Sequence, residues 1–242
     1  SGIISGDREN KIGNKGINNL VEIMALRAIP NGDEYDKDVA RAIRYAVDNG
    51  AKIINGSFGK YFSSNPEWVI DAIRYASENN VLVIAAAGNE SKDLDSLYND
   101  NYPNDQFFNK DEFSDTFIKV GASSINLNEN FTAYFSNYGK INVDIFAPGV
   151  DIYSSMPNNK YKSQDGTSMS SPVVAGVASL IMSYFPKLSA KKVKEIILES
   201  GIEIDLKIGN LGNNKHFREY SKSGKLINAY NALILASNSK RK

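Results

Sequence analysis

The sequence predicts an α/β fold with a mainly parallel central sheet, and two features carry this prediction. Between residues 21 and 86, short runs rich in β-branched residues alternate with segments whose apolar residues recur at helical spacing. One run, Val81–Ala86, is apolar throughout, which is typical of a strand that other elements cover on both faces. Strands that alternate with helices in this way indicate right-handed crossovers and parallel strand pairs.

The first half of the chain is expected to contain three strands and two helices. A helix is predicted over Asp36–Asp48 because its apolar residues fall on one face and Gly50 follows as a stop signal. Asn65, a capping residue followed by proline, favours a second helix that should reach about Asn79. The predicted strands are Val21–Arg27, Ile53–Ser57 and Val81–Ala86.

The second half begins with an acidic insertion, residues 90–116, which holds eight Asp and Glu residues against Lys92 and Lys110. One interpretation is a set of oxygen ligands for a structural Ca²⁺. No twelve-residue calcium loop is present, so a solvated insertion is preferred. The elements predicted after it are strands at Phe117–Ala122 and Val143–Phe146, and helices at about Ser170–Phe185, from the cap Ser189 to near Gly201, and at Lys225–Ala236.

Length and composition fit a globular protein without a membrane span. The 242 residues, 42% of them hydrophobic and 23% charged, are predicted to form one domain over residues 1–242, with a frayed tail at residues 237–242. Lys and Arg total 28, and so do Asp and Glu, which argues against a nucleic-acid-binding protein. The longest apolar run, Val81–Ala87, is too short to cross a bilayer.

Two residue types are scarce enough to exclude whole chemistries. The sequence has no cysteine, which excludes a cysteine nucleophile, disulfides and thiolate zinc sites. His216 is the one histidine, so a zinc site built on paired histidines is excluded as well. Apart from the calcium interpretation, no metal site is predicted.

One stretch that could carry chemistry is Asp165–Pro172, where Ser168 stands between small residues just before a predicted helix. A helix start directs free N–H groups and partial positive charge at an oxygen on which negative charge develops. Gly166 would let an extended substrate approach the main chain. Considered by itself, Ser168 or Ser170 is better explained as a helix cap.

The other stretch is Val81–Asn89, a buried strand that ends in small residues and an asparagine. This order places the carboxamide of Asn89 at the carboxyl edge of the sheet, where α/β proteins usually bind ligands. An amide donor there could stabilise a tetrahedral oxyanion by about 3–4 kcal/mol. Considered by itself, Asn89 is better explained as a turn residue.

Together, the two stretches resemble the subtilisin-like serine peptidases, the subtilases. The strings Gly-Thr-Ser-Met-Ser-Ser-Pro (residues 166–172) and Ala-Ala-Gly-Asn (residues 86–89) are similar to motifs of that family. Three further blocks match family segments in the right order, namely Asn55–Gly59, Phe135–Gly139 and Phe146–Val150. The resemblance covers nearly the whole chain apart from the acidic insertion and the C-terminal part, and it implies a subtilisin-like three-layer α/β/α fold.

The resemblance also implies roles for individual residues. Ser168 matches the nucleophile of the family, and its N–H would form an oxyanion hole with the side chain of Asn89. An extended substrate would lie against two segments that line the specificity pocket and a third segment near Gly32. The implied substrate-binding residues are Gly32, Ser57, Phe58, Gly59, Ala86, Ala87, Gly88, Gly166 and Thr167.

The sequence departs from the family at the other two members of the catalytic triad. The family needs a His to accept the serine proton and an Asp to orient that His, and neither motif is present. Ser1–Ile4 resembles the end of the histidine motif, so we expect an N-terminally incomplete domain and a separate N-terminal segment that carries both residues. His216 is interpreted as a solvated loop histidine, not as the base.

Other enzyme classes fit less well. Ser189 to Lys192 matches Ser-x-x-Lys of penicillin-binding acyltransferases and Lys222–Gly224 resembles their Lys-Thr-Gly element, but no Ser-x-Asn lies between them. The nucleophile elbow of α/β-hydrolases fails because Ser170 occupies the place of its last glycine. The stronger alternative is a catalytically inactive subtilase-fold module for binding or assembly, which would explain the missing Asp and His.

The sequence is therefore interpreted as part of a subtilisin-like serine endopeptidase that hydrolyses peptide bonds through an acyl-enzyme on Ser168. Its partner would be a peptide or protein substrate, with no nucleic acid. The family also implies a secreted protein in the extracellular space or cell envelope. The one cofactor considered is a structural Ca²⁺.

Overall fold

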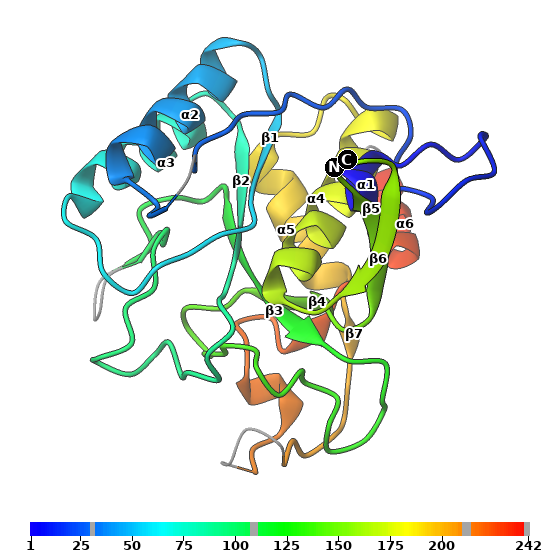
Figure 1. The fold of residues 1–242 in the computed structure, drawn as a ribbon. Helices are drawn as coiled ribbons and strands as arrows, with labels where there is room; N and C mark the ends of the chain where they lie inside the picture. Colours follow the sequence, from blue (N-terminus) through cyan, green and yellow to red (C-terminus); the bar gives the residue numbers. More distant parts are fainter. Residues whose placement is uncertain (30–31, 107–110, 210–213, 240–242) are drawn as a thin grey trace.

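A six-stranded sheet forms the centre of the computed structural model, which describes residues 1–29, 32–106, 111–209 and 214–239. The strand order is β1-β2-β3-β4-β8-β7 (Figure 1). The first five of these strands pair in parallel and β7 runs antiparallel to β8, so the predicted mainly parallel sheet is confirmed. The strands are β1 (Ile53–Gly56), β2 (Leu82–Ala86), β3 (Phe117–Ser123), β4 (Ile145–Pro148), β7 (Ile202–Glu203) and β8 (Lys225–Leu226).

Helices cover both faces of this sheet (Figure 1). Alternate residues of β2 mark the two faces, because Leu82 and Ile84 pack with α4, α5 and α6 whereas Val83 packs with α2 and α3. The predicted three-layer α/β/α architecture is confirmed. The helices are α1 (Gly2–Ser5), α2 (Asp36–Asp48), α3 (Pro66–Glu78), α4 (Thr167–Tyr184), α5 (Ala190–Ser200) and α6 (Ala229–Ser239), with a 3₁₀ helix over Phe217–Glu219.

Most of the predicted elements are present, with small shifts in their bounds. The helices α2 and α5 begin and end where the sequence predicts, and Ser189 caps α5 by accepting a hydrogen bond from the N–H of Lys192 at 3.2 Å. α4 begins at Thr167, not near Ser170. Ser168 therefore lies in the first turn of α4.

The strand predicted over Val21–Arg27 is wrong. These residues are irregular and pair with no strand of the described chain. Ile23 is 44% exposed and Met24 is 42% exposed, so neither is held in the core. A strand depends on ladder hydrogen bonds to a neighbour, and apolar composition without such a neighbour is not sufficient.

The C-terminal helix is also mispredicted. It begins at Ala229, because Lys225–Leu226 pair with β4 and β7 as the strand β8. It extends to Ser239, so residues 237–239 are helical and are not part of a frayed tail. Residues 240–242 of the predicted tail lie outside the described residues.

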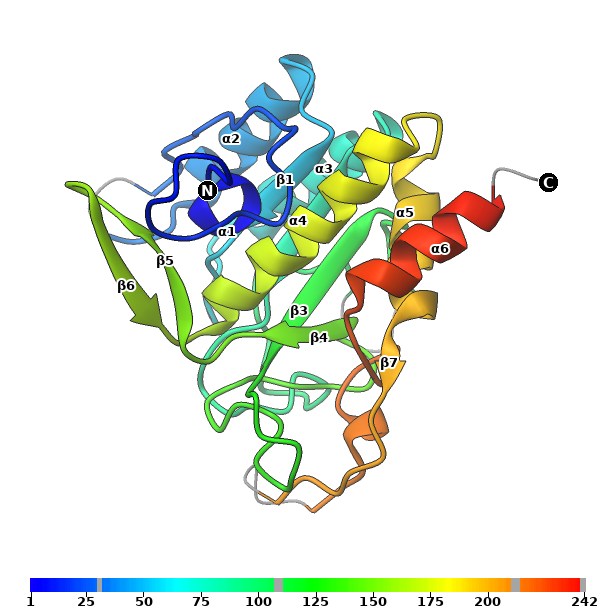
Figure 2. The same cartoon turned by 90° about the vertical axis from the view of Figure 1, so that its right-hand side faces the viewer.

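Besides the 3₁₀ helix, three features of the structure have no counterpart in the sequence prediction, and two of them lie beside α4. The hairpin of β5 (Ile152–Met156) and β6 (Lys160–Gln164) projects near the start of α4 (Figure 2). The short α1 and the segment after it pack along the same helix. Gly176 permits this approach, since a Cβ there would lie 2.8 Å from the Cβ of Ile17. The third feature is the edge strand β7.

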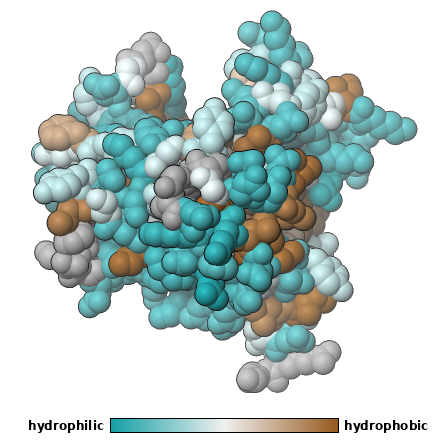
Figure 3. Space-filling model, turned by 90° about the horizontal axis from the view of Figure 1, so that it is seen from below, coloured by the Kyte–Doolittle hydropathy of each residue, from teal (hydrophilic) through white to brown (hydrophobic). Residues whose placement is uncertain are grey.

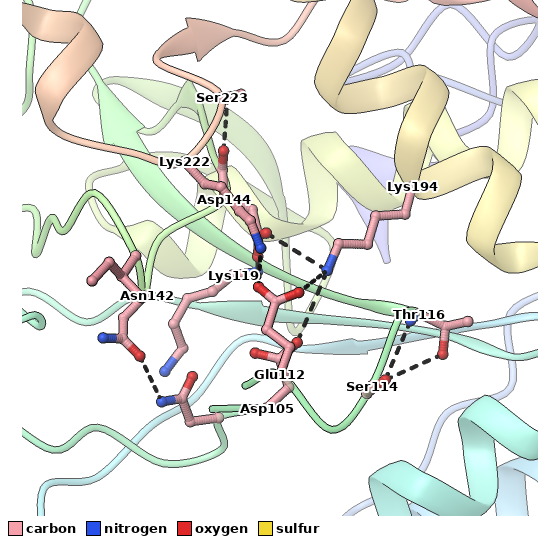
Figure 4. A network of polar contacts seen from close by, with 12 residues as sticks. Asp105, Glu112, Ser114, Thr116, Lys119, Asn142, Asp144, Lys194, Lys222 and Ser223 are labelled. Atoms are coloured by element: carbon pink, nitrogen blue, oxygen red, sulfur yellow. Dashed lines mark hydrogen bonds and ion pairs between the residues drawn. The ribbon is translucent and has the colours of Figure 1, made fainter. Parts of the chain in front are cut away.

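The acidic insertion is not the solvated loop that the sequence favours. Asp105, in its middle, is 4% exposed and lies close to charged groups of the sheet and of α5 (Figure 4). Lys119 of β3 is 1% exposed and donates hydrogen bonds from Nζ to the main-chain O and the Oδ1 of Asn101, at 2.9 and 2.7 Å. Part of the insertion is therefore anchored to the sheet, and residues 107–110 lie outside the described residues.

Lys194 of α5 is the centre of a buried charge cluster (Figure 4). Its Nζ lies 3.9 Å from Asp105 Oδ2, 3.6 Å from Glu112 Oε2 and 3.7 Å from Asp144 Oδ1. Burial opposes the charge of Lys194, but the three carboxylates outweigh that effect and raise its pKa. Glu112 also pairs with Lys222. The cations that balance the insertion thus come from distant parts of the sequence.

The pKa of Asp105 gives this cluster a testable pH dependence. Burial and the neighbouring Asp144 raise the pKa of Asp105 from 3.8 to about 8. Between these two values the folded chain holds a proton that the unfolded chain has released, so the contribution of Asp105 to stability falls as pH rises through this window. In Asp105→Asn this contribution is absent, and we expect the variant to become more stable relative to the wild type from about pH 4 to about pH 7.

Urea unfolding at several pH values measures this difference. The comparison is made up to about pH 7, because burial lowers the pKa of Lys119 to about 7 and this neighbouring group begins to lose its proton above that pH in both proteins. Asp71→Asn, on the exposed face of α3, is the control and should leave the slope unchanged. Equal slopes for Asp105→Asn and the wild type would contradict the prediction.

The surface carries hydrophobic side chains among mostly polar ones. The face seen from below is largely hydrophilic, with a hydrophobic band to one side of its centre (Figure 3). None of the helices in the described parts of the chain combines the length and the apolar character needed to cross a bilayer.

Candidate active site

The two stretches singled out by the sequence meet at one edge of the sheet. β2 ends at Ala86 and leads through Gly88, whose φ of +100° favours glycine, to Asn89. The N–H and the Oγ1 of Thr167, at the start of α4, both donate to Asn89 Oδ1, at 2.9 and 3.0 Å. The N–H of Gly88 in turn donates to Thr167 Oγ1 at 3.0 Å. Hydrogen bonds therefore join the end of β2 to the start of α4.

These contacts fix the direction of the Asn89 carboxamide. Its oxygen is engaged by Thr167, so its amino group points elsewhere. Asn89 Nδ2, Met169 Sδ and Ser168 N each lie 3.6 Å from the place that a Cβ on Gly166 would take. Two N–H donors, one from the loop after β2 and one from the start of α4, thus lie close together beside Gly166, and a pair of neighbouring donors is what a developing oxyanion requires.

Ser168 lies beside these donors and is half-buried. Its Oγ donates a hydrogen bond to the main-chain O of Ser57 at 3.0 Å. Within the described ranges, no imidazole or carboxylate is hydrogen-bonded to this hydroxyl. The structure therefore places a serine hydroxyl and two N–H donors together, with no base in contact with the serine among the residues that it describes.

His216 lies in a different part of the molecule. It precedes the 3₁₀ helix below the sheet, away from the start of α4 (Figure 1). Its Nδ1 is 3.6 Å from Asp205 Oδ1, and its main-chain N–H donates to Glu219 Oε1 at 3.1 Å. The prediction that His216 is not the base agrees with this position, although the side chain has an acidic neighbour and is only partly exposed.

The predicted substrate-binding segments follow two paired strands. Gly56 at the end of β1 is in register with Ala85 of β2, so the segments after them leave the sheet side by side. Phe58 packs against the α2–α3 core, and Gly32 lies in an exposed loop before α2. The structure thus brings together Ser57, Phe58, Gly59, Ala86, Ala87, Gly88, Asn89, Gly166, Thr167 and Ser168 and places Gly32 in a separate loop.

Three residues near the site were missed by the sequence reasoning. Tyr61, Glu90 and Asn137 form hydrogen bonds beneath the loop that carries Asn89. Asn137 belongs to the Phe135–Gly139 block, which matches a family segment, but the match does not indicate what Asn137 does. Nothing in the sequence pattern indicates that Tyr61 and Glu90 meet it.

The family comparison decides the relationship of this chain. The model of the family described as "Subtilase family" matches residues 1–223. The chain belongs to the subtilase family. This subtilase is 33% identical to the "Cell wall-associated protease" of Bacillus subtilis (strain 168) over 91% of its own length and 22% of that protein. It is 35% identical to "Subtilisin DY" of Bacillus licheniformis over 77% of its own length and 63% of that protein.

Solved structures agree with the fold of this subtilase. The "Prenylagaramide maturation protease PagA" matches with a TM-score of 0.71 and 28% identity, over 96% of this chain and 79% of that one. A protease structure from Pseudoalteromonas arctica matches with a TM-score of 0.78 and 22% identity, over 97% of this chain and 69% of that one. The chain spans less than two thirds of the length of the two curated relatives named above.

Proposed function

We propose that this subtilase is a serine endopeptidase that forms its acyl-enzyme on Ser168. The observation that carries the proposal is the pair of N–H donors beside Gly166, Asn89 Nδ2 and Ser168 N, each 3.6 Å from the place that a Cβ on Gly166 would take. Such a pair of donors has no use in a helix cap or a turn, the alternatives that each residue allows by itself. It suits a negative charge that forms on a carbonyl oxygen.

In the proposed reaction, Ser168 Oγ attacks the carbonyl carbon of the scissile bond. The carbonyl oxygen becomes negative and accepts hydrogen bonds from Asn89 Nδ2 and the N–H of Ser168. The hydroxyl proton passes to a base and then to the leaving amine, and water later hydrolyses the ester. To react, Ser168 must release its hydrogen bond to Ser57 O.

The base is proposed to be a His that, with its Asp, lies outside residues 1–242. This proposal is supported by the distance of His216 from the start of α4 and by the family, which uses an Asp and a His with its serine. The substrate is proposed to lie extended, with its main chain against Ser57–Gly59, Ala86–Gly88 and the loop at Gly32. The first two of these segments directly follow β1 and β2, which pair in parallel, and this arrangement supports the proposed path.

A binding or assembly module with a subtilase fold is the second candidate. The absence of a base beside Ser168 within the described chain favours it. The hydrogen bonds from Thr167 that direct the Asn89 carboxamide favour the enzyme, because a binding module needs no aligned oxyanion donors.

We also propose where the protein is located, and consider whether it binds a structural Ca²⁺. An extracellular or cell-envelope location is supported by the relative named a cell wall-associated protease. The acidic insertion gives calcium little support, since no group of three or more His, Cys, Asp or Glu residues suited to a metal occurs in the described part of the chain. Asp105 and Glu112 lie beside Lys194 instead.

A fluorophosphonate probe tests the enzyme proposal. In the full-length protein, we expect the probe to label Ser168, as located by peptide mass spectrometry, and Ser168→Ala to lower peptide hydrolysis by about a millionfold. Ser183→Ala, on the last turn of the same helix, is the control and should leave both unchanged. Failure of the full-length wild type to react would overturn the enzyme proposal and favour the binding module.

A further inference from the structure

Three side chains from separate segments meet under the loop that follows β2. Tyr61 comes from the loop after β1, Glu90 follows Asn89, and Asn137 comes from the loop between β3 and β4. They are hydrogen-bonded to one another, since the Tyr61 hydroxyl donates to Glu90 Oε2 and Asn137 Nδ2 lies 2.5 Å from the Tyr61 hydroxyl. We call these three residues the brace.

Asn137 is the buried member of the brace, with 0% exposure. Its Nδ2 donates to the main-chain O of Ala87 at 2.7 Å, and its Oδ1 accepts from the N–H groups of Glu90 and Lys92 at 3.2 and 2.9 Å. Its own N–H donates to the main-chain O of Gly88 at 3.0 Å. One side chain and its main chain therefore satisfy four polar groups on both sides of Asn89.

Glu90 holds Asn89 from the other direction. Its Oε2 accepts the main-chain N–H of Asn89 at 2.8 Å. Burial, and then the hydrogen bond to Glu90, raise the pKa of Tyr61, so the hydroxyl keeps its proton at neutral pH and acts as a donor. The Nζ of Lys92 lies 3.9 Å from the centre of the Tyr61 ring, which adds a cation–π contact.

Gly88 shows how closely the brace fits the loop. A Cβ on Gly88 would lie 2.4 Å from Asn137 Nδ2, 2.9 Å from the Tyr61 hydroxyl and 3.0 Å from Glu90 Oε2. The loop therefore rests directly on these three polar groups. Because Tyr61 follows Ser57–Gly59 in the sequence, the brace also connects the two segments between which the substrate is proposed to lie.

The Asn89 carboxamide is thus fixed from two sides. Thr167 holds its side-chain oxygen, and the brace holds the main chain before and after it. The three atoms nearest to a Cβ built on Gly166 are Asn89 Nδ2, Met169 Sδ and Ser168 N, and none of them belongs to the brace. The brace can therefore affect the oxyanion site only through the position of Asn89.

We propose that Asn137, Tyr61 and Glu90 are positioning residues that keep the Asn89 carboxamide aligned with the N–H of Ser168. This inference rests on the proposed peptidase function. It predicts that a change in the brace lowers the rate of the chemical step and leaves substrate binding nearly unchanged, because an oxyanion donor acts mainly in the transition state.

The test compares two buried asparagines. Asn137→Asp keeps the acceptor and removes the donors of Nδ2. Asn18→Asp is the matched control, because Asn18 is 1% exposed, accepts the N–H of Leu20 and donates through Nδ2 to Ser179 and Ser183, toward the opposite end of α4 from Thr167. Tyr61→Phe removes only one hydroxyl and serves as a milder variant if Asn137→Asp does not fold.

Two readouts separate the inference from the function on which it rests. The first is hydrogen exchange at the N–H of Thr167, which donates to Asn89 Oδ1, does not touch the brace and needs no activity. We expect exchange there to become about tenfold faster in Asn137→Asp and Tyr61→Phe, and to match the wild type in Asn18→Asp. The second is kinetics of the full-length protein, in which we expect kcat to fall by about 10- to 100-fold with KM within about twofold.

The outcomes are distinct. Unchanged exchange at Thr167 in both brace variants would overturn the inference, whatever the activity. Faster exchange with unchanged kcat would also overturn it, because the brace would then order the loop without serving catalysis. If exchange is faster in the brace variants but the wild type never reacts with the fluorophosphonate probe, the brace cannot serve catalytic positioning, and that result would overturn the inference together with the proposed function.

Discussion

Replacing Asn89 with alanine is expected to lower kcat for peptide hydrolysis by about 10²- to 10³-fold in the full-length protein, with little change in KM. In the proposed reaction, Asn89 Nδ2 donates to the substrate oxygen as it becomes negative, and alanine offers no donor there. The loss falls on kcat because the hydrogen bond strengthens as charge develops, which binding of the ground state does not require. Steady-state kinetics on a peptide substrate measure both constants.

A second asparagine provides the control for this prediction. Asn79 is exposed at the end of α3, where its Nδ2 donates to the main-chain O of Tyr75 at 2.8 Å. Asn79→Ala should leave kcat and KM at the wild-type values. A rise in KM with unchanged kcat in Asn89→Ala would show uniform binding by Asn89 and would contradict its role as an oxyanion donor.

The helices α2, α3 and α5 could be predicted well because their evidence is local. The apolar spacing over Asp36–Asp48 and the cap at Ser189 contain the information that decides α2 and α5. The strand predicted over Val21–Arg27 failed for the opposite reason, because a strand depends on a neighbour that the local pattern cannot supply. The same dependence explains β8, where two residues within a helical pattern pair with β4 and β7 instead.

The candidate site, like the fold, could be predicted only where its evidence is local in the sequence. Ser168 and Asn89 could be singled out because each sits in a contiguous string of small residues that resembles a family motif. The hydrogen bonds that orient Asn89 could not be predicted, because Thr167 is far from Asn89 in the sequence. The contact between Tyr61 and Asn137 likewise joins segments whose order along the chain gives no sign of their proximity.

The acidic insertion was interpreted wrongly for an electrostatic reason. A stretch of carboxylates with few local cations favours a solvated loop when only its own residues are considered. In the structure, Lys119 and Lys194 come from β3 and α5 and lie beside these carboxylates in the interior. A local charge count cannot include cations that the fold supplies from other elements.

Lys194→Met is expected to destabilise the protein by about 3–5 kcal/mol, the loss typical of removing one partner from buried ion pairs. Methionine fills a similar volume but leaves Asp105, Glu112 and Asp144 without the ammonium that lies 3.6–3.9 Å from all three. Because the folded chain holds a proton on Asp105 below about pH 8, the cost at neutral pH comes from the other acidic side chains of the cluster, which have lost water and would have no cation in its place. Urea unfolding, followed by circular dichroism, measures the change in the free energy of unfolding.

Lys192→Met, on the same helix, is the control, because it removes an exposed charge whereas Lys194→Met removes a buried one. Lys192 pairs with Glu195 at 2.8 Å, but both side chains are 40% exposed, so the loss should be far smaller than in Lys194→Met. Because Lys194 links α5 to the acidic insertion, hydrogen exchange over residues 101–106 and 111–116 should accelerate in Lys194→Met and not in Lys192→Met. Equal losses of stability in the two variants would mean that the buried cluster contributes no more than a surface ion pair, and would contradict the role assigned to Lys194.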